Sequence, residues 1–384
     1  MDLFLYIILF LFIIASVQYT TKGCVNNLSN CKLELVTGQW SFILYIALGI
    51  YVVIRAIVYD TGADYLAYYN HFVTRSHHLI DVWGEGREIG YRYLIDFLSS
   101  YFSYPYVFFG FCAFVGMGSL LCISLKFGKA APYIVLGWVL YLFNLSMNLY
   151  RQYIAMSLIF CALYILLSQK VKKKKILGAS ICIILAYFFH HSSLVGGICV
   201  FSIFFLRNHI VNKWILIGAL MLTTVASMTV LSHIISAIGA YSDAYMAMNE
   251  RGYTAAEMLQ SQYDVGKMTY VNMLCSVVLI WYGDRVLNKN AILRYFYLVM
   301  AICFIITPLT NQEILMRMRL YLTNFAVIGY GLTLYFNKKL YSVSSNILLV
   351  VVVLYQIFYM FLYQNSLLLE AYPLQFNYPQ IRNL

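Results

Sequence analysis

The sequence predicts an all-α fold, a polytopic integral membrane protein with about 11–13 transmembrane or re-entrant helices. Composition is the first reason, because 62% of the residues are hydrophobic, only 11% are charged and the mean hydropathy is +0.76. Average soluble domains carry about 25% charged residues. The second reason is that apolar runs of about 18 residues or more recur along the chain. We expect residues 1–384 to form one polytopic membrane domain.

The net charge of +11 has an explanation in membrane topology. Lysine and arginine occur in short clusters between the apolar runs, where they mark cytoplasmic loops. A nucleic-acid-binding protein would show a basic groove or a soluble module with interleaved aromatic residues, and neither is visible. The lipid bilayer is therefore an expected partner, and nucleic acid is not.

The apolar runs give the expected helices in chain order. The first covers residues 3–20 and the second 41–59, where Arg55 lies close enough to the end for its charge to snorkel to the membrane surface. Residues 91–103 (YRYLIDFLSSYFS) are amphipathic and too short to span, which predicts a re-entrant or interfacial helix ending near Pro105. The remaining runs are residues 104–125, 131–147, 149–168, 176–206, 213–232, 268–287, 291–310, 318–336 and 343–363.

The run at 176–206 is too long for one spanning helix. A helix of that length would extend roughly 46 Å, whereas the hydrocarbon core of a bilayer is ~30 Å thick. The run contains the polar sequence His190-His191-Ser192-Ser193. We therefore expect two short helices that are broken at these four residues.

The positive clusters also predict the orientation of the chain, because cytoplasmic loops are enriched in lysine and arginine. The clusters are Lys126 with Lys129, Lys170 with residues 172–175, Arg207 with Lys213, Arg285 with Lys289 and Arg294, and Lys338 with Lys339. Counting spans, with 91–103 not crossing, leaves the N-terminus outside and the 21–39 linker inside. The segments placed on the extracytoplasmic face are the charged loop 60–92, the turn 144–151, the break at His190, a lid-like loop 233–267, the loop 311–317 and the polar C-terminal tail 364–384.

The stretch 60–92 is where polar chemistry is expected. It holds five of the 15 acidic residues and three of the 7 histidines in a chain that is poor in charge. His71, His77 and His78 lie near Asp64 and Asp81, but this loose spacing is weak support for a metal site, and no metal is predicted.

A few ionisable residues elsewhere fall on the same predicted face. They are Arg151 at the start of one run, His190 at the helix break, and Arg317 and Arg319 at the mouth of another run. An ionisable group at the bilayer centre costs about 2.5 kcal/mol or more and usually marks a function or a partner. Structural roles remain open: Arg151 as a helix-pairing cation, Arg317 or Arg319 as an interfacial anchor, and His190 as a helix cap. Most of the 36 tyrosines are expected to serve packing and interface belts.

Four short motifs resemble the EpsG family of Wzy-like bacterial polysaccharide polymerases, in the same order and spacing. The likeness covers most of the first 210 residues, with a weaker echo near 315–325. Ile89 stands where the family usually has a proline, while Glu88, Gly90 and Tyr91 are kept. The motifs are TGADYLAYY at 61–69 (G-x-D-Y-x-x-Y), EIGY at 88–91 (E-P-G-Y), YRQYIAMSLIF at 150–160 (R-Q-x-x-A-x-S) and FHHSSL at 189–194 (F-H-x-S-A-L).

The resemblance implies a glycosyltransferase of GT-C-like architecture in the bacterial plasma membrane, multi-pass, with its active face outside. Such an enzyme transfers a growing glycan from polyprenyl pyrophosphate to the non-reducing end of a lipid-linked repeat unit. Its substrate is a polyprenyl-pyrophosphate-linked oligosaccharide, and a chain-length regulator and a flippase are further partners that the resemblance suggests. No cofactor is expected, and arginines can take the charge-neutralising role of a metal ion.

The candidate residues follow from the needs of this transfer. Arginine forks suit the pyrophosphate, so Arg151 is assigned to developing negative charge, with Arg317 and Arg319 as further cationic candidates. A carboxylate or neutral histidine can activate the acceptor hydroxyl, which makes Asp64 and Glu88 the preferred groups and His190 the rival base. Sugar contacts are expected from Gln152, Tyr91, Tyr65 and Tyr68, the last two as a stacking wall.

Three other functions fit part of the sequence. A flippase or exporter of the same lipid-linked oligosaccharide would be expected to show internal repeats and charges through the middle of the membrane, whereas no repeat is visible and the charges gather toward one face. A non-catalytic subunit of a polysaccharide assembly complex would not need the clustered arginine, glutamate and histidine. A ligase or acyltransferase that uses another donor is the third alternative.

Overall fold

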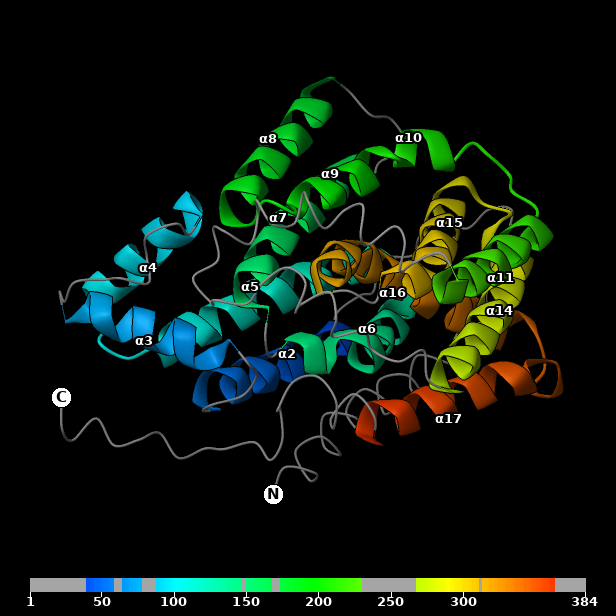
Figure 1. Cartoon of the computed structure of the whole chain (residues 1–384), viewed down its shortest axis with the longest axis horizontal. Helices are drawn as coiled ribbons and strands as arrows, with labels where there is room; N and C mark the ends of the chain where they lie inside the picture. The colour runs from blue at the N-terminus through cyan, green and yellow to red at the C-terminus, as the bar shows by residue number, and fades with distance from the viewer. Residues whose placement is uncertain are drawn as a thin grey trace.

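The computed structural model describes residues 39–58, 64–77, 88–146, 149–167, 173–229, 267–310 and 313–362. Every regular element in these ranges is helical, and no strand occurs among them (Figure 1). The predicted first run at 3–20, the loop residues 233–266 and the tail 364–384 lie outside the described residues.

The bounds of the helices agree closely with the predicted apolar runs, because each run of apolar residues can form one uninterrupted helix. The exceptions are α16, which at 28 residues extends beyond the predicted run, and α3, which forms inside the charged stretch. The helices are α2 (Gln39–Ile57), α3 (Tyr65–Ser76), α4 (Ile89–Tyr101), α5 (Tyr106–Leu125), α6 (Ala131–Ser146), α7 (Tyr150–Leu166), α8 (Lys173–Phe189), α9 (Ser193–Phe201), α10 (Ile203–Leu206), α11 (Lys213–Thr229), α14 (Lys267–Leu287), α15 (Ala291–Ile306), α16 (Glu313–Leu340) and α17 (Ile347–Leu362), with short 3-10 turns η3 (Gly128–Ala130), η4 (Thr307–Leu309) and η5 (Ser344–Asn346).

The predicted break in the 176–206 run is confirmed. Helix α8 ends at Phe189 and α9 begins at Ser193. The turn between them keeps its backbone hydrogen bonds, with the Ser193 amide donating to the His190 carbonyl at 2.9 Å. The polar sequence at this turn therefore changes the chain direction without leaving these backbone groups unpaired.

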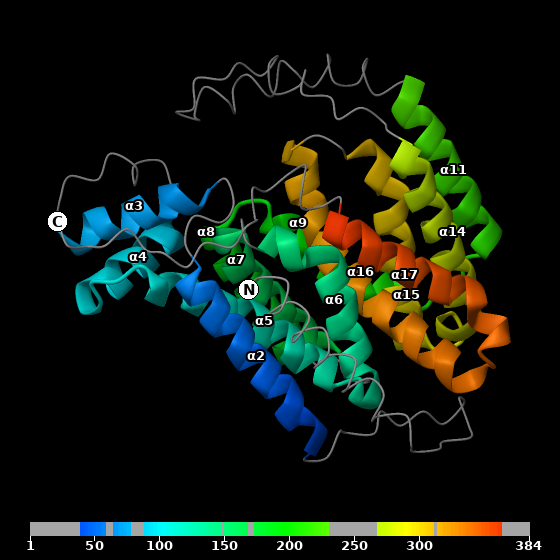
Figure 2. The ribbon, with the colours of Figure 1, turned by 90° about the horizontal axis from the view of Figure 1, so that it is seen from below.

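Helices α3 and α4 lie side by side at one end of the molecule, and α11 and α14 lie at the opposite end (Figures 1 and 2). The predicted short helix at 91–103 is present as α4, whose 13 residues extend roughly 20 Å and cannot span a ~30 Å core. An ion pair between Arg75 and Asp96, with an N–O distance of 3.4 Å, joins α3 to α4.

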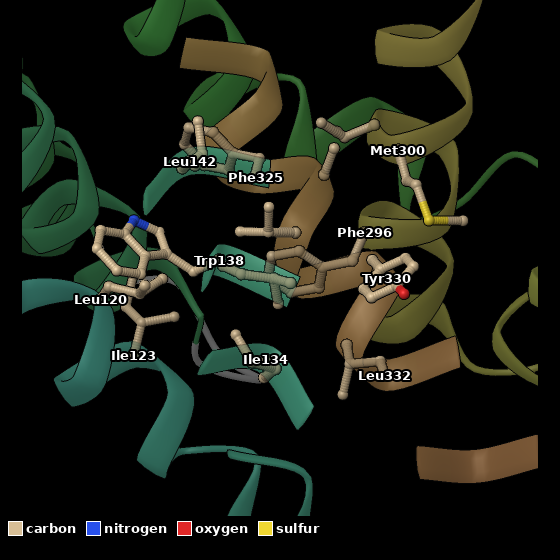
Figure 3. Close-up of a cluster of buried hydrophobic side chains, with 14 of the residues drawn as sticks. Leu120, Ile123, Ile134, Trp138, Leu142, Phe296, Met300, Phe325, Tyr330 and Leu332 are labelled. Atoms are coloured by element: carbon tan, nitrogen blue, oxygen red, sulfur yellow. The ribbon is translucent and has the colours of Figure 1, made fainter. Parts of the chain in front are cut away.

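Several described helices are apolar enough to suit a membrane protein. Tyr106–Leu125 and Ala291–Leu309 are both long and apolar enough to cross a bilayer, and shorter apolar helices accompany them. The core between α5, α6, α15 and α16 is built from large apolar side chains. Figure 3 shows Trp138 and Ile134 of α6 between Leu120 of α5 and Phe296 of α15. A separate cluster of buried apolar side chains, which includes Tyr68, Tyr91 and Tyr150, lies at the end of the molecule where the polar residues gather.

Arg55 corrects one prediction, because its side chain is 2% exposed and does not reach the surface. Its Nη2 donates to the Ser146 carbonyl at 3.4 Å, and its guanidinium carbon lies 5.0 Å from the centre of the Tyr150 ring. A carbonyl and an aromatic face inside the bundle thus stabilise the cation, so it turns inward instead of extending to the membrane boundary.

Candidate functional site

Three side chains from distant parts of the sequence meet at the end of the bundle. Glu88 precedes α4, Arg151 is the second residue of α7, and His190 lies in the turn between α8 and α9. Arg151 Nη1 donates to Glu88 Oε2, and His190 Nδ1 lies 3.0 Å from Glu88 Oε1. An ionised carboxylate can only accept hydrogen bonds, so His190 Nδ1 carries the proton in this contact. We call these three residues the ionic triad.

Gly90 allows the triad to assemble. A Cβ at this position would lie 2.9 Å from the Phe188 carbonyl oxygen and 3.2 Å from the Phe189 ring. Any larger residue would therefore push the start of α4 away from the end of α8. Because Glu88 precedes Gly90 and His190 follows Phe189, this close approach places the carboxylate beside the imidazole.

Two tyrosines hold the Arg151 side chain. Its Nε donates to the Tyr68 hydroxyl at 2.8 Å, and its guanidinium carbon lies 5.8 Å from the Tyr68 ring centre and 5.6 Å from that of Tyr91. The Tyr91 hydroxyl is in turn 2.8 Å from Nδ1 of His71. These contacts fix the plane of the guanidinium before any substrate arrives.

The triad is mostly buried but reaches the surface. The side chains of Glu88, Arg151 and His190 are 9%, 13% and 14% exposed. Burial on its own would raise the pKa of Glu88, but the hydrogen bond from His190 and the charge of Arg151 outweigh it and lower this pKa to about 2. Burial is also the main influence on His190 and lowers its pKa, an effect that the hydrogen bond of its Nδ1 to Glu88 only partly offsets. At neutral pH the glutamate is therefore ionised and the histidine is neutral.

A second ion pair lies beside the triad. Arg317 Nη2 is 3.8 Å from Asp64 Oδ2, and the two side chains are 33% and 13% exposed. Gln152, next to Arg151 in α7, donates from Nε2 to the Arg317 carbonyl at 2.6 Å. The positive charge of Arg317 also contributes to lowering the pKa of His190. Arg317 is thus the more exposed cation of the group.

Two predicted residues do not join this group. Arg319 Nη1 bonds to the Thr307 carbonyl and to Thr310 Oγ1, both at 3.2 Å. Residues two apart on a helix face different directions, so Arg319 turns toward the end of α15 while Arg317 faces Asp64. Tyr65 is 0% exposed and stacks on Phe109 with ring centres 4.5 Å apart, which makes it a core residue and removes it from the sugar-stacking wall.

The described residues contain no group of three histidine, cysteine, aspartate or glutamate side chains that could hold a metal ion. His71, one of the histidines in the charged stretch, is buried and bonded to Tyr91. His71 was missed as a support of the site, although its spacing of three residues from Tyr68 puts both on one face of a helix.

Tyr150 is a second residue whose part the sequence did not reveal. Its ring contacts that of Tyr68 edge-on, with centres 4.9 Å apart, and it also faces Arg55. It therefore connects the ionic triad to the buried arginine in the interior. The motif that contains Tyr150 was recognised, but nothing in the spacing indicated that Arg55 would reach it.

Comparison with known proteins gives one match. The family model described as the EpsG family matches residues 40–376, a range that includes the triad, Asp64 and Arg317. No curated protein and no solved structure matches the chain. The likeness seen in the four motifs is therefore confirmed over most of the chain. This protein belongs to the EpsG family, whose members take part in exopolysaccharide biosynthesis.

Proposed function

We propose that this protein is a polysaccharide polymerase, a glycosyltransferase that acts on lipid-linked glycans. It moves the growing chain from polyprenyl pyrophosphate to the non-reducing end of an incoming lipid-linked repeat unit, at the outer face of the plasma membrane. The observation that carries this proposal is the ionic triad. Glu88 precedes Arg151 by 63 residues and His190 by 102 residues in the sequence, yet it contacts both.

In this reaction an acceptor hydroxyl attacks the anomeric carbon of the donor sugar, a new C–O bond forms, and the bond to pyrophosphate breaks. The proton of the hydroxyl goes to a base, and the leaving pyrophosphate gains negative charge. A site for this step needs a base next to fixed cations. The triad and Arg317 supply this combination.

His190 is the better base of the two groups in contact. Glu88, with a pKa of about 2, has little tendency to take a proton near neutral pH. Neutral His190 donates from Nδ1 to Glu88, which leaves Nε2 as the nitrogen that can accept one. Glu88 then stabilises the imidazolium that forms, so its role shifts from direct acceptor activation to orientation of the histidine.

The arginines serve the leaving group. Arg317 is 33% exposed, and a guanidinium carries five N–H donors, so it can contact Asp64 and a phosphate oxygen together. Arg151 is held by Glu88, Tyr68 and Tyr91, and provides a fixed positive charge behind the reacting groups. Fixed charges of this kind need no reorganisation as the transition state forms. The chain-length regulator and the flippase remain proposed partners on this account.

A product ladder tests the proposal. Purified protein in lipid is incubated with a synthetic polyprenyl-pyrophosphate-linked repeat unit, and the length of the glycan is measured. We expect wild-type protein to produce a ladder of longer products, and folded Arg151→Ala and Glu88→Gln variants to produce almost none. Arg75→Gln, which alters an exposed ion pair outside the triad, serves as the matched control and should retain the ladder.

Long polymer made by folded Arg151→Ala and Glu88→Gln proteins would contradict the proposal. Passage of the substrate across the bilayer with no lengthening would support a transport function in its place.

A further inference from the structure

A cluster of neutral polar groups lies next to the ionic triad. Gln152 Oε1 and Ser193 Oγ are buried and have no hydrogen-bond partner among the described residues, and the buried Ser192 Oγ and Tyr321 hydroxyl face each other with no further partner there. Gln152 is 5% exposed, and Ser193 and Tyr321 are both 0% exposed. Buried polar atoms in folded proteins are nearly always hydrogen-bonded. Several such atoms in one place indicate a polar occupant. We call these four residues the neutral polar cluster.

The contacts of Gln152 and Tyr321 place the cluster beside the triad. Gln152 donates to the carbonyl of Arg317, which lies one helical turn before Tyr321 in α16. Aromatic side chains in a helix lean toward its N-terminus, so the Tyr321 ring lies near that carbonyl. The Tyr321 hydroxyl faces Ser192 and is close enough to Glu88 to sense its charge.

Gly196 in α9 makes room for the Tyr321 ring. A Cβ at this position would lie 2.8 Å from Cδ1 of Tyr321 and 3.0 Å from Ile159. The ring is therefore held against α9, with its hydroxyl directed toward the turn that carries His190. The neutral polar cluster and the proposed base thus belong to one continuous site.

The chemistry of Gln152 restricts the occupant. If its amide were reversed, an oxygen would face the Arg317 carbonyl oxygen at 2.6 Å, so Nε2 must point there and Oε1 is the buried atom left without a partner. An amide oxygen only accepts hydrogen bonds, and the occupant must therefore donate one. Phosphate and carboxylate groups cannot donate, whereas a sugar hydroxyl both donates and accepts.

We propose that the neutral polar cluster, through Gln152, Ser192, Ser193 and Tyr321, is a subsite that binds hydroxyl groups of the acceptor sugar. The assignment rests on the proposed polymerase function, and it selects the acceptor because the cluster adjoins His190 and Glu88 and carries no cation. The donor pyrophosphate is left to Arg317.

A two-substrate assay separates the acceptor from the donor. The donor is a lipid-linked repeat unit whose acceptor hydroxyl is replaced by hydrogen, and the acceptor is the same repeat unit on an alkyl tail without pyrophosphate. We expect Tyr321→Phe and Ser192→Ala to raise the KM for the acceptor about 5- to 30-fold, a loss typical of one or two hydrogen bonds, with the KM for the donor unchanged. Ser157→Ala is the matched control, because this buried α7 hydroxyl bonds the Ile154 carbonyl of its own helix.

Direct binding of the alkyl glycoside to wild-type and variant proteins, measured by thermal shift, gives a readout that needs no turnover. If the wild-type protein shows no turnover but Tyr321→Phe binds the glycoside more weakly than wild type, the subsite is upheld and the polymerase function is overturned. Normal turnover with an unchanged acceptor KM in both variants would overturn the subsite and leave the function standing, the cluster then holding a structural water only.

Discussion

Two arginines lie on either side of Tyr150, and their surroundings differ. Arg55 is 2% exposed and contacts a backbone carbonyl and an aromatic ring, whereas Arg151 is 13% exposed and contacts a carboxylate that also binds a histidine. The two regions are connected, since the Tyr150 ring touches both Arg55 and Tyr68. The difference teaches that a costly buried charge marks a site only when titratable groups from other segments surround it. The same change at both arginines should therefore have opposite consequences.

The largest effect is expected from Arg151→Lys. Lysine keeps the charge but loses the planar fork that contacts Glu88 and Tyr68 together. We expect turnover in the product-ladder assay to fall about 10²- to 10³-fold, as for the loss of one fixed electrostatic contact in an active site. Thermal unfolding of the purified variant should stay close to that of the wild type. Near-normal turnover of this variant would show that Arg151 is not part of the functional site.

Arg55→Lys should lower stability more than activity. It removes the contact with the Ser146 carbonyl and weakens that with Tyr150, and a buried polar group left without a partner costs about 1–3 kcal/mol. We expect a lower melting temperature for the variant in lipid, while turnover per folded molecule stays within about threefold of wild type, a change of less than 1 kcal/mol. Lost turnover with unchanged melting would instead extend the functional site to Arg55.

Gly90→Ala tests how the two helices bring the triad together. The added methyl group meets a backbone oxygen at 2.9 Å and forces α4 away from α8, a shift that costs about 1–3 kcal/mol and misplaces Glu88. Reduced turnover and a lower melting temperature are both expected. Gly49→Ala is the control, because a Cβ there has no atom within 4 Å. Equal behaviour of the two alanine variants would show that the close approach is unimportant.

The pH profile should give the smallest change. His190 must be neutral to act as a base, and burial lowers its pKa, so turnover should be constant at neutral pH and fall only below the usual histidine range of about 6.5. The charge of Glu88 raises the pKa of His190. In the Glu88→Gln variant, the pH at which the residual turnover falls should therefore be lower still. A shift to higher pH would contradict the histidine assignment. The free energy of unfolding should also decrease below about pH 6.5, where the unfolded chain takes up the histidine proton first.

Much of the fold was predictable because the number of residues in an apolar run sets the length of the helix that it forms. The length of the 176–206 run required a break, and the polar residues at His190 gave its place. Helix α3 was missed because its stretch is polar, although Tyr65, Tyr68, Tyr69 and Phe72 are spaced as the buried face of a helix. That spacing was present in the sequence and indicates how such a helix could be found.

The site was predictable only in part, for a physical reason. Hydropathy and charge give the depth of a residue along a helix but not the direction in which it points. Arg151 and His190 were placed by depth and also lie in motifs with Glu88, and these three converge, while Arg319 and Arg55 were placed by depth and point elsewhere. Of the neutral polar cluster only Gln152 was predicted as a sugar contact, because buried serine and tyrosine do not stand out in a hydrophobic chain.

A double-mutant cycle on Glu88 and His190 tests most directly whether the triad works as one unit. Turnover is measured for Glu88→Gln, His190→Gln and the double variant under the product-ladder conditions. If Glu88 acts by orienting His190, the double variant should be no slower than the slower single variant, since the second change removes a function already lost. Losses that multiply in the double variant would show that the two residues act independently and would contradict the account.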